Sequence, residues 1–133
     1  MKFTQQSPAG AHLIRRYGAD FIVVGDEDIR RSCLVSATTL TRGWPPHSVE
    51  DLTAAHLAAI FDLAPEVVVL STGASQKFPR AALRAEFATR KIGLEVMEIG
   101  AACRTYNVLV GEERKVLAAM LLSSSAEPAK GSE

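Results

Sequence analysis

The stretch that decides the fold runs from residue 65 to residue 107 and reads PEVVVLSTGASQKFPRAALRAEFATRKIGLEVMEIGAACRTYN. Its apolar runs predict a buried strand at 66–71 and a second strand at 94–99. Between them, Pro79 is tolerated in a first helical turn and opens a helix predicted over 79–91. A strand–helix–strand unit crosses over right-handed and gives two parallel strands. The sequence therefore predicts an α/β fold.

Further elements are predicted on both sides of this stretch. Short apolar runs separated by Gly-containing turns predict an antiparallel meander at the start of the chain. The predicted strands are 12–17, 21–25, 32–37, 66–71, 94–99 and 116–122, and the predicted helices are 53–63, 79–91 and 101–110. The simplest packing of these elements has three layers. It is a central mixed β-sheet with helices on both faces and an N-terminal antiparallel meander.

The length of 133 residues suits one domain, which we expect over 1–122. The remaining segment, 123–133, is small and polar and is expected to be a disordered C-terminal tail. Apolar residues at inward-facing positions predict a core. Its expected members are Phe21, Val23, Leu57, Phe61, Val68, Leu70, Leu83, Phe87, Val96, Tyr106 and Leu109.

Composition excludes several classes of protein. The chain has 15 Lys and Arg against 15 Asp and Glu, which argues against a nucleic-acid partner. Its two cysteines are far apart and no Cys/His cluster is present, so neither a metal nor a cofactor is predicted. The apolar runs are far shorter than the roughly 20 residues that span a bilayer, which predicts no membrane insertion. The first ten residues lack the apolar segment of a signal peptide, and we expect a cytoplasmic protein.

Two segments are candidates for a binding site because each follows a predicted strand. The loop 71–76 presents backbone N–H groups at the start of a helix, and the helix 101–110 begins after the next strand. A site where they meet would use Ser71, Thr72, Gly73, Ser75, Cys103, Arg104, Thr105 and Asn107. The alternative for the loop is an ordinary turn whose Gly and Ser are chosen for conformation. The alternative for Cys103 is an inert buried thiol, and no catalytic residue is predicted.

Two other features have both a structural and a functional interpretation. The cations Lys77, Arg80, Arg84 and Lys91 form either a solvated helix face or a docking surface for an acidic protein. Trp44, in the sequence RGWPP, either plugs the end of the core, which we favour, or projects toward a partner.

Taken as a set, these motifs resemble the family of small bacterial and archaeal proteins that also contains a mitochondrial respiratory complex I assembly factor. The likeness covers about residues 3 to 122. Its most specific pieces are Ser71-Thr72-Gly73, Ala102-Cys103, Thr105, Tyr106-Asn107 and Glu113-Arg114. The resemblance implies a three-layer α/β fold and a non-enzymatic role in binding respiratory-complex subunits. It brings no catalytic residue to this chain.

Three hypotheses follow. The first is a non-enzymatic protein-binding module, an assembly factor for a respiratory complex. The second is a small-ligand or anion-binding protein, or an enzyme, with its site at the loop 71–76 and the N-terminus of the helix 101–110. The third is a structural homo-oligomer.

Overall fold

The computed structural model describes residues 10–123. Its centre is a five-stranded sheet with the strand order β5-β4-β8-β6-β7. The strands are β4 (Cys33–Ser36), β5 (Leu40–Arg42), β6 (Val67–Ser71), β7 (Gly93–Met97) and β8 (Val116–Met120). β6 is parallel to both β7 and β8, whereas β4 is antiparallel to both β5 and β8. The sheet is therefore mixed, and β6 lies in its interior as the apolar run predicted.

Side chains on the two central strands alternate between two hydrophobic clusters. In β6, Val67 and Val69 face one cluster while Val68 and Leu70 face the other. β8 places Ala118 on the first side and Ala119 on the second. Because both faces of these strands are covered, they read as continuous apolar runs.

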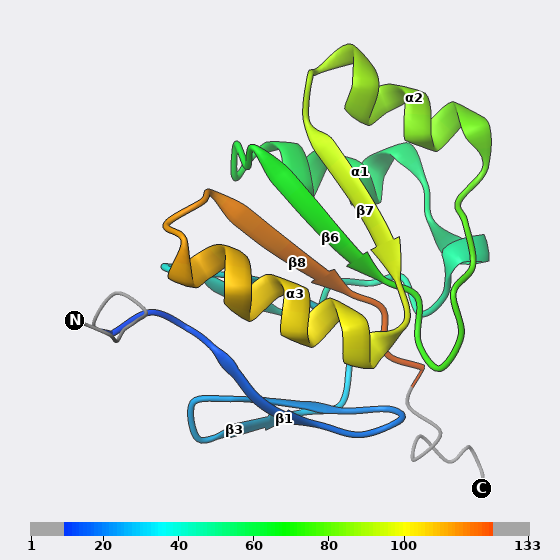
Figure 1. The fold of residues 1–133 in the computed structure, drawn as a ribbon. Coiled ribbons are helices and arrows are strands. Elements are labelled where there is room, and N and C mark those ends of the chain that lie inside the picture. The colour runs from blue at the N-terminus through cyan, green and yellow to red at the C-terminus, as the bar shows by residue number, and fades with distance from the viewer. Residues whose placement is uncertain (1–9, 124–133) are drawn as a thin grey trace, which may run out of the picture.

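Helices cover both faces of the sheet (Figure 1). α1 (Ala54–Phe61) and α2 (Ala81–Thr89) pack on one face through Leu57, Ile60, Leu83 and Phe87. α3 (Ile99–Gly111) packs on the other face through Ile99, Ala102, Cys103, Tyr106 and Val110. The predicted three-layer α/β fold is confirmed.

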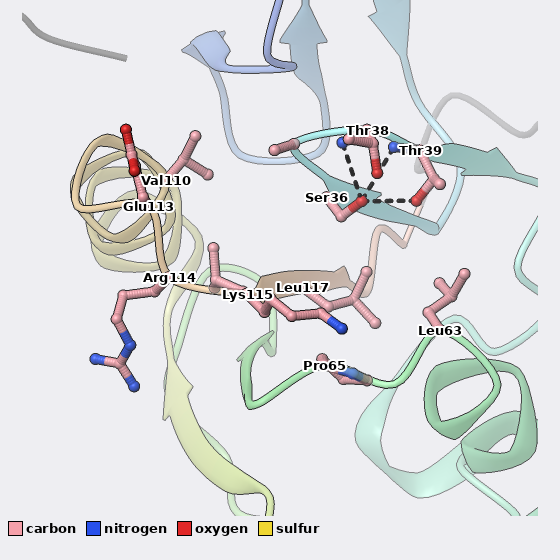
Figure 2. Close-up of a pocket in the computed structure, with 12 residues that line it drawn as sticks. Ser36, Thr38, Thr39, Leu63, Pro65, Val110, Glu113, Arg114, Lys115 and Leu117 are labelled. Atoms are coloured by element: carbon pink, nitrogen blue, oxygen red, sulfur yellow. Dashed lines mark hydrogen bonds between the residues drawn. The ribbon is translucent and has the colours of Figure 1, made fainter. Parts of the chain in front are cut away.

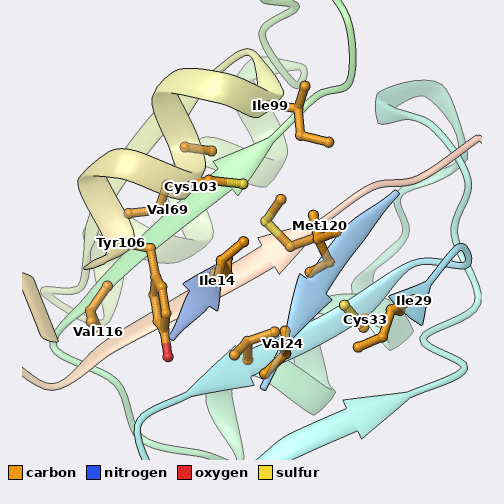
Figure 3. Close-up of a cluster of buried hydrophobic side chains, with 14 of the residues drawn as sticks. Ile14, Val24, Ile29, Cys33, Val69, Ile99, Cys103, Tyr106, Val116 and Met120 are labelled. Atoms are coloured by element: carbon orange, nitrogen blue, oxygen red, sulfur yellow. The ribbon is translucent and has the colours of Figure 1, made fainter. Parts of the chain in front are cut away.

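A second, three-stranded antiparallel sheet forms the meander and packs against α3. Its strands are β1 (Ile14–Tyr17), β2 (Ile22–Val24) and β3 (Glu27–Ile29). Figure 3 shows Ile14, Val24 and Ile29 of this sheet with Tyr106 and Cys103 of α3 in one cluster. The meander thus covers the part of the core that α3 leaves open.

Several predicted boundaries were wrong. The segment 32–37 was predicted to be the third strand of the meander, but it corresponds to β4 and belongs to the five-stranded sheet. The third strand of the meander is β3. Both β3 and β5 were missed. α3 begins at Ile99 instead of residue 101, because Glu98 is its N-cap and not part of a strand. The tail predicted from residue 123 lies, apart from Ser123, outside the described residues.

The predicted core is largely confirmed, with four exceptions. Seven of the named side chains are buried, including Tyr106, Phe87 and Val68. The exceptions are only partly buried: Phe21, Phe61, Val96 and Leu109. Within residues 10–123, no helix is long and apolar enough to cross a bilayer.

Candidate functional site

The loop after β6 is organised around the hydroxyl of Thr72. This hydroxyl donates to the carbonyl of Ser75 at 2.6 Å and accepts from the backbone N–H of Lys77 at 3.1 Å. Gly73 has a φ of +94°, a conformation that glycine adopts without strain. These bonds hold the loop as an ordered turn, and Gln76 ties it to β7 by donating to the carbonyl of Val96 at 2.9 Å. This agrees with the structural alternative given above.

The loop and the start of α3 do lie side by side, as predicted. The backbone N–H of Ile99 donates to the carbonyl of Gly73 at 2.8 Å. The Glu98 carboxylate accepts from the N–H groups of Gly100 at 2.8 Å and Ala101 at 2.7 Å. These bonds, first to Ala101 and then to Gly100, lower the pKa of Glu98. The N–H groups at the start of α3, which we expected to be open to an anion, are therefore already bound within the chain.

Ser71 ends β6 and carries the one buried side-chain oxygen that lacks a partner among the described residues. Its side chain is fully buried. The alternation along β6 turns this side chain to the α3 side of the sheet, with Val67 and Val69. A buried hydroxyl without a partner destabilises the fold by about 1–3 kcal/mol.

Cys103 lies in the core and not in an exposed site. Only 2% of this residue is exposed, and it packs in the cluster of Figure 3. Burial raises the pKa of its thiol to about 12. A nucleophilic cysteine needs a lowered pKa, so this thiol is unsuited to attack.

Two side chains of α3 bind the backbone of β1 and of the residues just before it. The Asn107 amide donates to the carbonyl of Ile14 at 2.8 Å, and its oxygen accepts from the Ile14 N–H at 2.9 Å. The Tyr106 hydroxyl donates to the carbonyl of His12 at 2.7 Å. Asn107 therefore has a structural role that the sequence pattern did not indicate.

The predicted site residues fall into two separate cavities. Thr72, Gly73 and Ser75 line a loop cavity of about 400 Å³, together with residues 47–50. The other cavity, of about 410 Å³, lies between β1 and α3, and we call it the β1–α3 cavity. It is lined by Ile14, Arg15, Arg16, Tyr17, Phe21, Cys103, Arg104 and Asn107. Ser71 and Thr105 line neither of them.

A third and larger cavity of about 560 Å³ was missed from the sequence (Figure 2). It lies at the opposite end of the sheet, where β8 begins, and we call it the large cavity. Its lining residues are Ser36, Ala37, Thr38, Thr39, Leu63, Pro65, Val110, Glu113, Arg114, Lys115, Val116 and Leu117. The Ser36 hydroxyl shapes one wall by accepting from the N–H groups of Thr38 and Thr39. These residues come from three separate connections and the element ends beside them, so no single motif could indicate the cavity.

The remaining candidates are structural or exposed. Trp44 is 3% exposed and its indole N–H donates to the carbonyl of His56 at 3.2 Å, which confirms that it plugs the core. Lys77, Arg80, Arg84 and Lys91 are exposed, and Arg80 donates to the carbonyl of Leu52. Residues 10–123 contain no group of three or more His, Cys, Asp or Glu that could hold a metal.

Fold and cavities together define a small α/β protein with a mixed sheet, and solved structures share this architecture. An NMR structure of a Xanthomonas campestris protein matches with a TM-score of 0.80 and 35% identity, covering 93% of this chain and 94% of that one. A model of the family described as protein of unknown function (DUF498/DUF598) matches residues 14–121. The chain belongs to this family.

Two further relatives have descriptive names. The chain is 35% identical over 119 residues to NADH dehydrogenase (ubiquinone) 1 alpha subcomplex assembly factor 3 of Danio rerio, covering 88% of this chain and 68% of that protein. It is 31% identical over 68 residues to the 13 kDa major membrane protein of Francisella tularensis subsp. holarctica (strain LVS). That match covers 51% of this chain and 55% of the Francisella protein, so the chain spans little more than half of that relative's length.

Proposed function

We infer that this protein is a protein-binding module that assists the assembly of a respiratory complex. The observation that carries this proposal is the 35% identity to the Danio rerio assembly factor over 88% of this chain. A match of this length includes most of the described elements instead of one motif. The sequence similarity therefore extends over most of the chain that presents the surface.

The chemistry of the candidate residues supports binding over catalysis. The Cys103 thiol is buried with a pKa of about 12, which opposes a thiolate nucleophile. The hydroxyl of Thr72 and the side-chain amide of Asn107 are both engaged in hydrogen bonds within the chain. These groups stabilise a turn and a strand, as polar side chains do in a rigid scaffold that presents a binding surface.

The large cavity is the surface that we assign to the partner. Leu63, Val110 and Leu117 give it apolar walls, and Lys115 extends across it toward Leu63 (Figure 2). The Arg114 guanidinium is already paired with Glu66 at 3.2 Å. In residues 10–123, the Lys115 ammonium makes no hydrogen bond or ion pair, and its charge helps to lower the pKa of the nearby Glu66 carboxylate. An apolar side chain of a partner subunit, flanked by a carboxylate, fits both the walls and this cation.

Affinity capture of the tagged protein from its native cell tests this function. We expect subunits of a respiratory NADH dehydrogenase to be recovered with the unaltered chain. Leu63→Glu places a charge in the large cavity and should abolish their recovery. Val108→Glu is the control, because Val108 is an exposed apolar residue of α3 that lies outside the cavity. This variant should leave recovery unchanged.

Two results would contradict the proposal. One is the absence of these subunits from the captured material of the unaltered protein. The other is equal recovery with Leu63→Glu, which would move the contact to another surface.

A further inference from the structure

The β1–α3 cavity differs from the other cavities in its charge. Its lining includes three arginines, Arg15, Arg16 and Arg104, and no carboxylate. The whole chain has no net charge, so this concentration of cations is local. Such a cavity favours an anionic ligand.

A β-bulge in β1 brings two consecutive arginines to this cavity. Ile14 is opposite Val24, but the next pair joins Arg16 to Val23, so Arg15 is an extra residue in the strand. Side chains of neighbouring residues in a regular strand point to opposite faces. Here Arg15 and Arg16 both line the cavity. Bulges occur next to binding sites because they redirect side chains in this way.

The guanidinium groups keep donors available for a ligand. Within residues 10–123, the Arg16 guanidinium has no hydrogen bond or ion pair. Arg104 donates from one nitrogen to the Tyr17 hydroxyl at 2.9 Å, and its charge helps to lower the pKa of the nearby Glu98 carboxylate. The other N–H groups of its fork make no hydrogen bond within residues 10–123. Arg15 lies 3.8 Å from Asp26, an exposed pair that contributes little. Arginine forks match the oxygens of a phosphate group better than those of any neutral ligand.

Tyr17 supplies an exposed ring beside these arginines. Tyr17 is 41% exposed, and it is one of three large hydrophobic residues in the described part of the chain that are exposed to solvent. Its hydroxyl is fixed by Arg104, and a Cβ at Gly100 would lie 2.9 Å from that hydroxyl. The hydroxyl end of the ring is thus held against α3, so a flat ligand can stack on the ring at little cost in entropy.

We propose that the β1–α3 cavity binds a small phosphorylated molecule with a flat ring, of the nucleoside monophosphate kind. Arg16 and Arg104 bind its phosphate, and Tyr17 packs against its ring. The volume of about 410 Å³ lies in the range that small-molecule sites occupy. This site is separate from the large cavity and does not depend on the assembly function.

Titration of the isotope-labelled protein with AMP, followed by backbone amide NMR shifts, tests the proposal. We expect saturable shifts at residues 14–17 and 103–107. Inorganic phosphate should bind with weaker affinity and shift the Tyr17 amide less, because it lacks the ring that packs against Tyr17. Adenosine, which lacks the phosphate, should bind more weakly than AMP. Arg16→Gln removes a charged donor without removing a bond of the fold, and should weaken AMP binding about tenfold or more.

Arg42→Gln is the matched control. Arg42 is also an exposed arginine on a strand, is paired with Glu27, and lies outside the β1–α3 cavity. AMP binding should be unchanged in this variant. Absence of saturable shifts, or equal weakening in both variants, would overturn the proposal. Shifts at residues 14–17 with anionic lipid vesicles but not with AMP would overturn it as well, in favour of a membrane surface.

Discussion

The side chain of Asn107 binds the backbone of Ile14 through both of its hydrogen-bonding groups, although 93 residues separate them in the sequence. The amide takes the place that a neighbouring strand would occupy beside β1. Because α3 packs on the five-stranded sheet while Asn107 binds the meander, this contact joins the two sheets.

Asn107→Ala should destabilise the protein by about 1–3 kcal/mol, because it leaves the N–H and the carbonyl of Ile14 without their partners. Urea unfolding measures this loss, and amide hydrogen exchange at Ile14 should become faster. Val108→Ala, at the exposed neighbouring position, should change stability much less. Equal stability of the two variants would show that the Ile14 contact contributes nothing.

Gly18→Ala should destabilise the turn between β1 and β2. A Cβ at this position would lie 2.1 Å from Cε1 of Phe21, so the ring must move. We expect a loss of about 1–3 kcal/mol in denaturant unfolding. Gly111→Ala is the control, because a Cβ there meets no atom within 4 Å and alanine favours the helix. A Gly18→Ala protein as stable as the control would contradict the packing of Phe21.

The Glu98→Gln protein should lose less stability in acid than the unaltered chain does. The lowered pKa of Glu98 means that its ionised form is bound more strongly in the folded state. This stabilisation is complete above the ordinary glutamate pKa of about 4.3 and is lost as the pH falls through the lowered value in the folded state. Urea unfolding midpoints at pH 7 and pH 3 should therefore differ less for Glu98→Gln than for the unaltered chain. An identical difference would mean that the cap does not titrate with folding.

Both cysteines should resist alkylation in the folded protein. Burial raises the pKa of Cys33 and of Cys103 to about 12, so almost no thiolate exists at pH 8. Mass spectrometry after treatment with iodoacetamide should find no adduct until denaturant is added, and then two. Rapid native labelling of Cys103 alone would contradict its burial and reopen the case for a reactive thiol.

Phe87→Ala should cost about 3–5 kcal/mol, whereas Phe61→Ala should cost less. The two rings meet edge to face with centroids 5.1 Å apart, but Phe87 is buried and Phe61 is only partly so. The guanidinium of Arg90 lies over the Phe61 ring, 4.2 Å from the ring centroid. In Phe61→Ala, the Arg90 side chain can partly cover the space that the ring leaves. Equal losses in urea unfolding would contradict this difference in burial.

The elements that the sequence predicted well are those with strong patterns of their own. The valine run of β6 and the helical spacing around Leu83 and Phe87 indicate their structure without help from the rest of the chain. β3 and β5 have three residues each, and most of their side chains are exposed. They are strands because β2 and β4 pair with them, and pairing of this kind leaves little trace in local sequence.

For the candidate site, the sequence indicated one backbone contact but not the surroundings of the side chains. The loop after β6 does contact the start of α3, since Gly73 accepts from Ile99. However, α3 begins two residues earlier than expected, and each residue rotates a helix by about 100°. Cys103, Arg104 and Asn107 consequently line a cavity beside β1 instead of facing the loop. Binding at these residues remains a prediction.

The position of β8 has a consequence for how the chain is made. β8 is the last strand within residues 10–123, yet it is the middle strand of the sheet and the one that joins β4 to β6. During synthesis, the β4–β5 hairpin and the β6–α2–β7 unit emerge first, each with an open edge where β8 will pair. Open edges of this kind invite aggregation. β8 must therefore leave the ribosome before the sheet can close, and a product cut short before Val116 would be a target for chaperones and proteases.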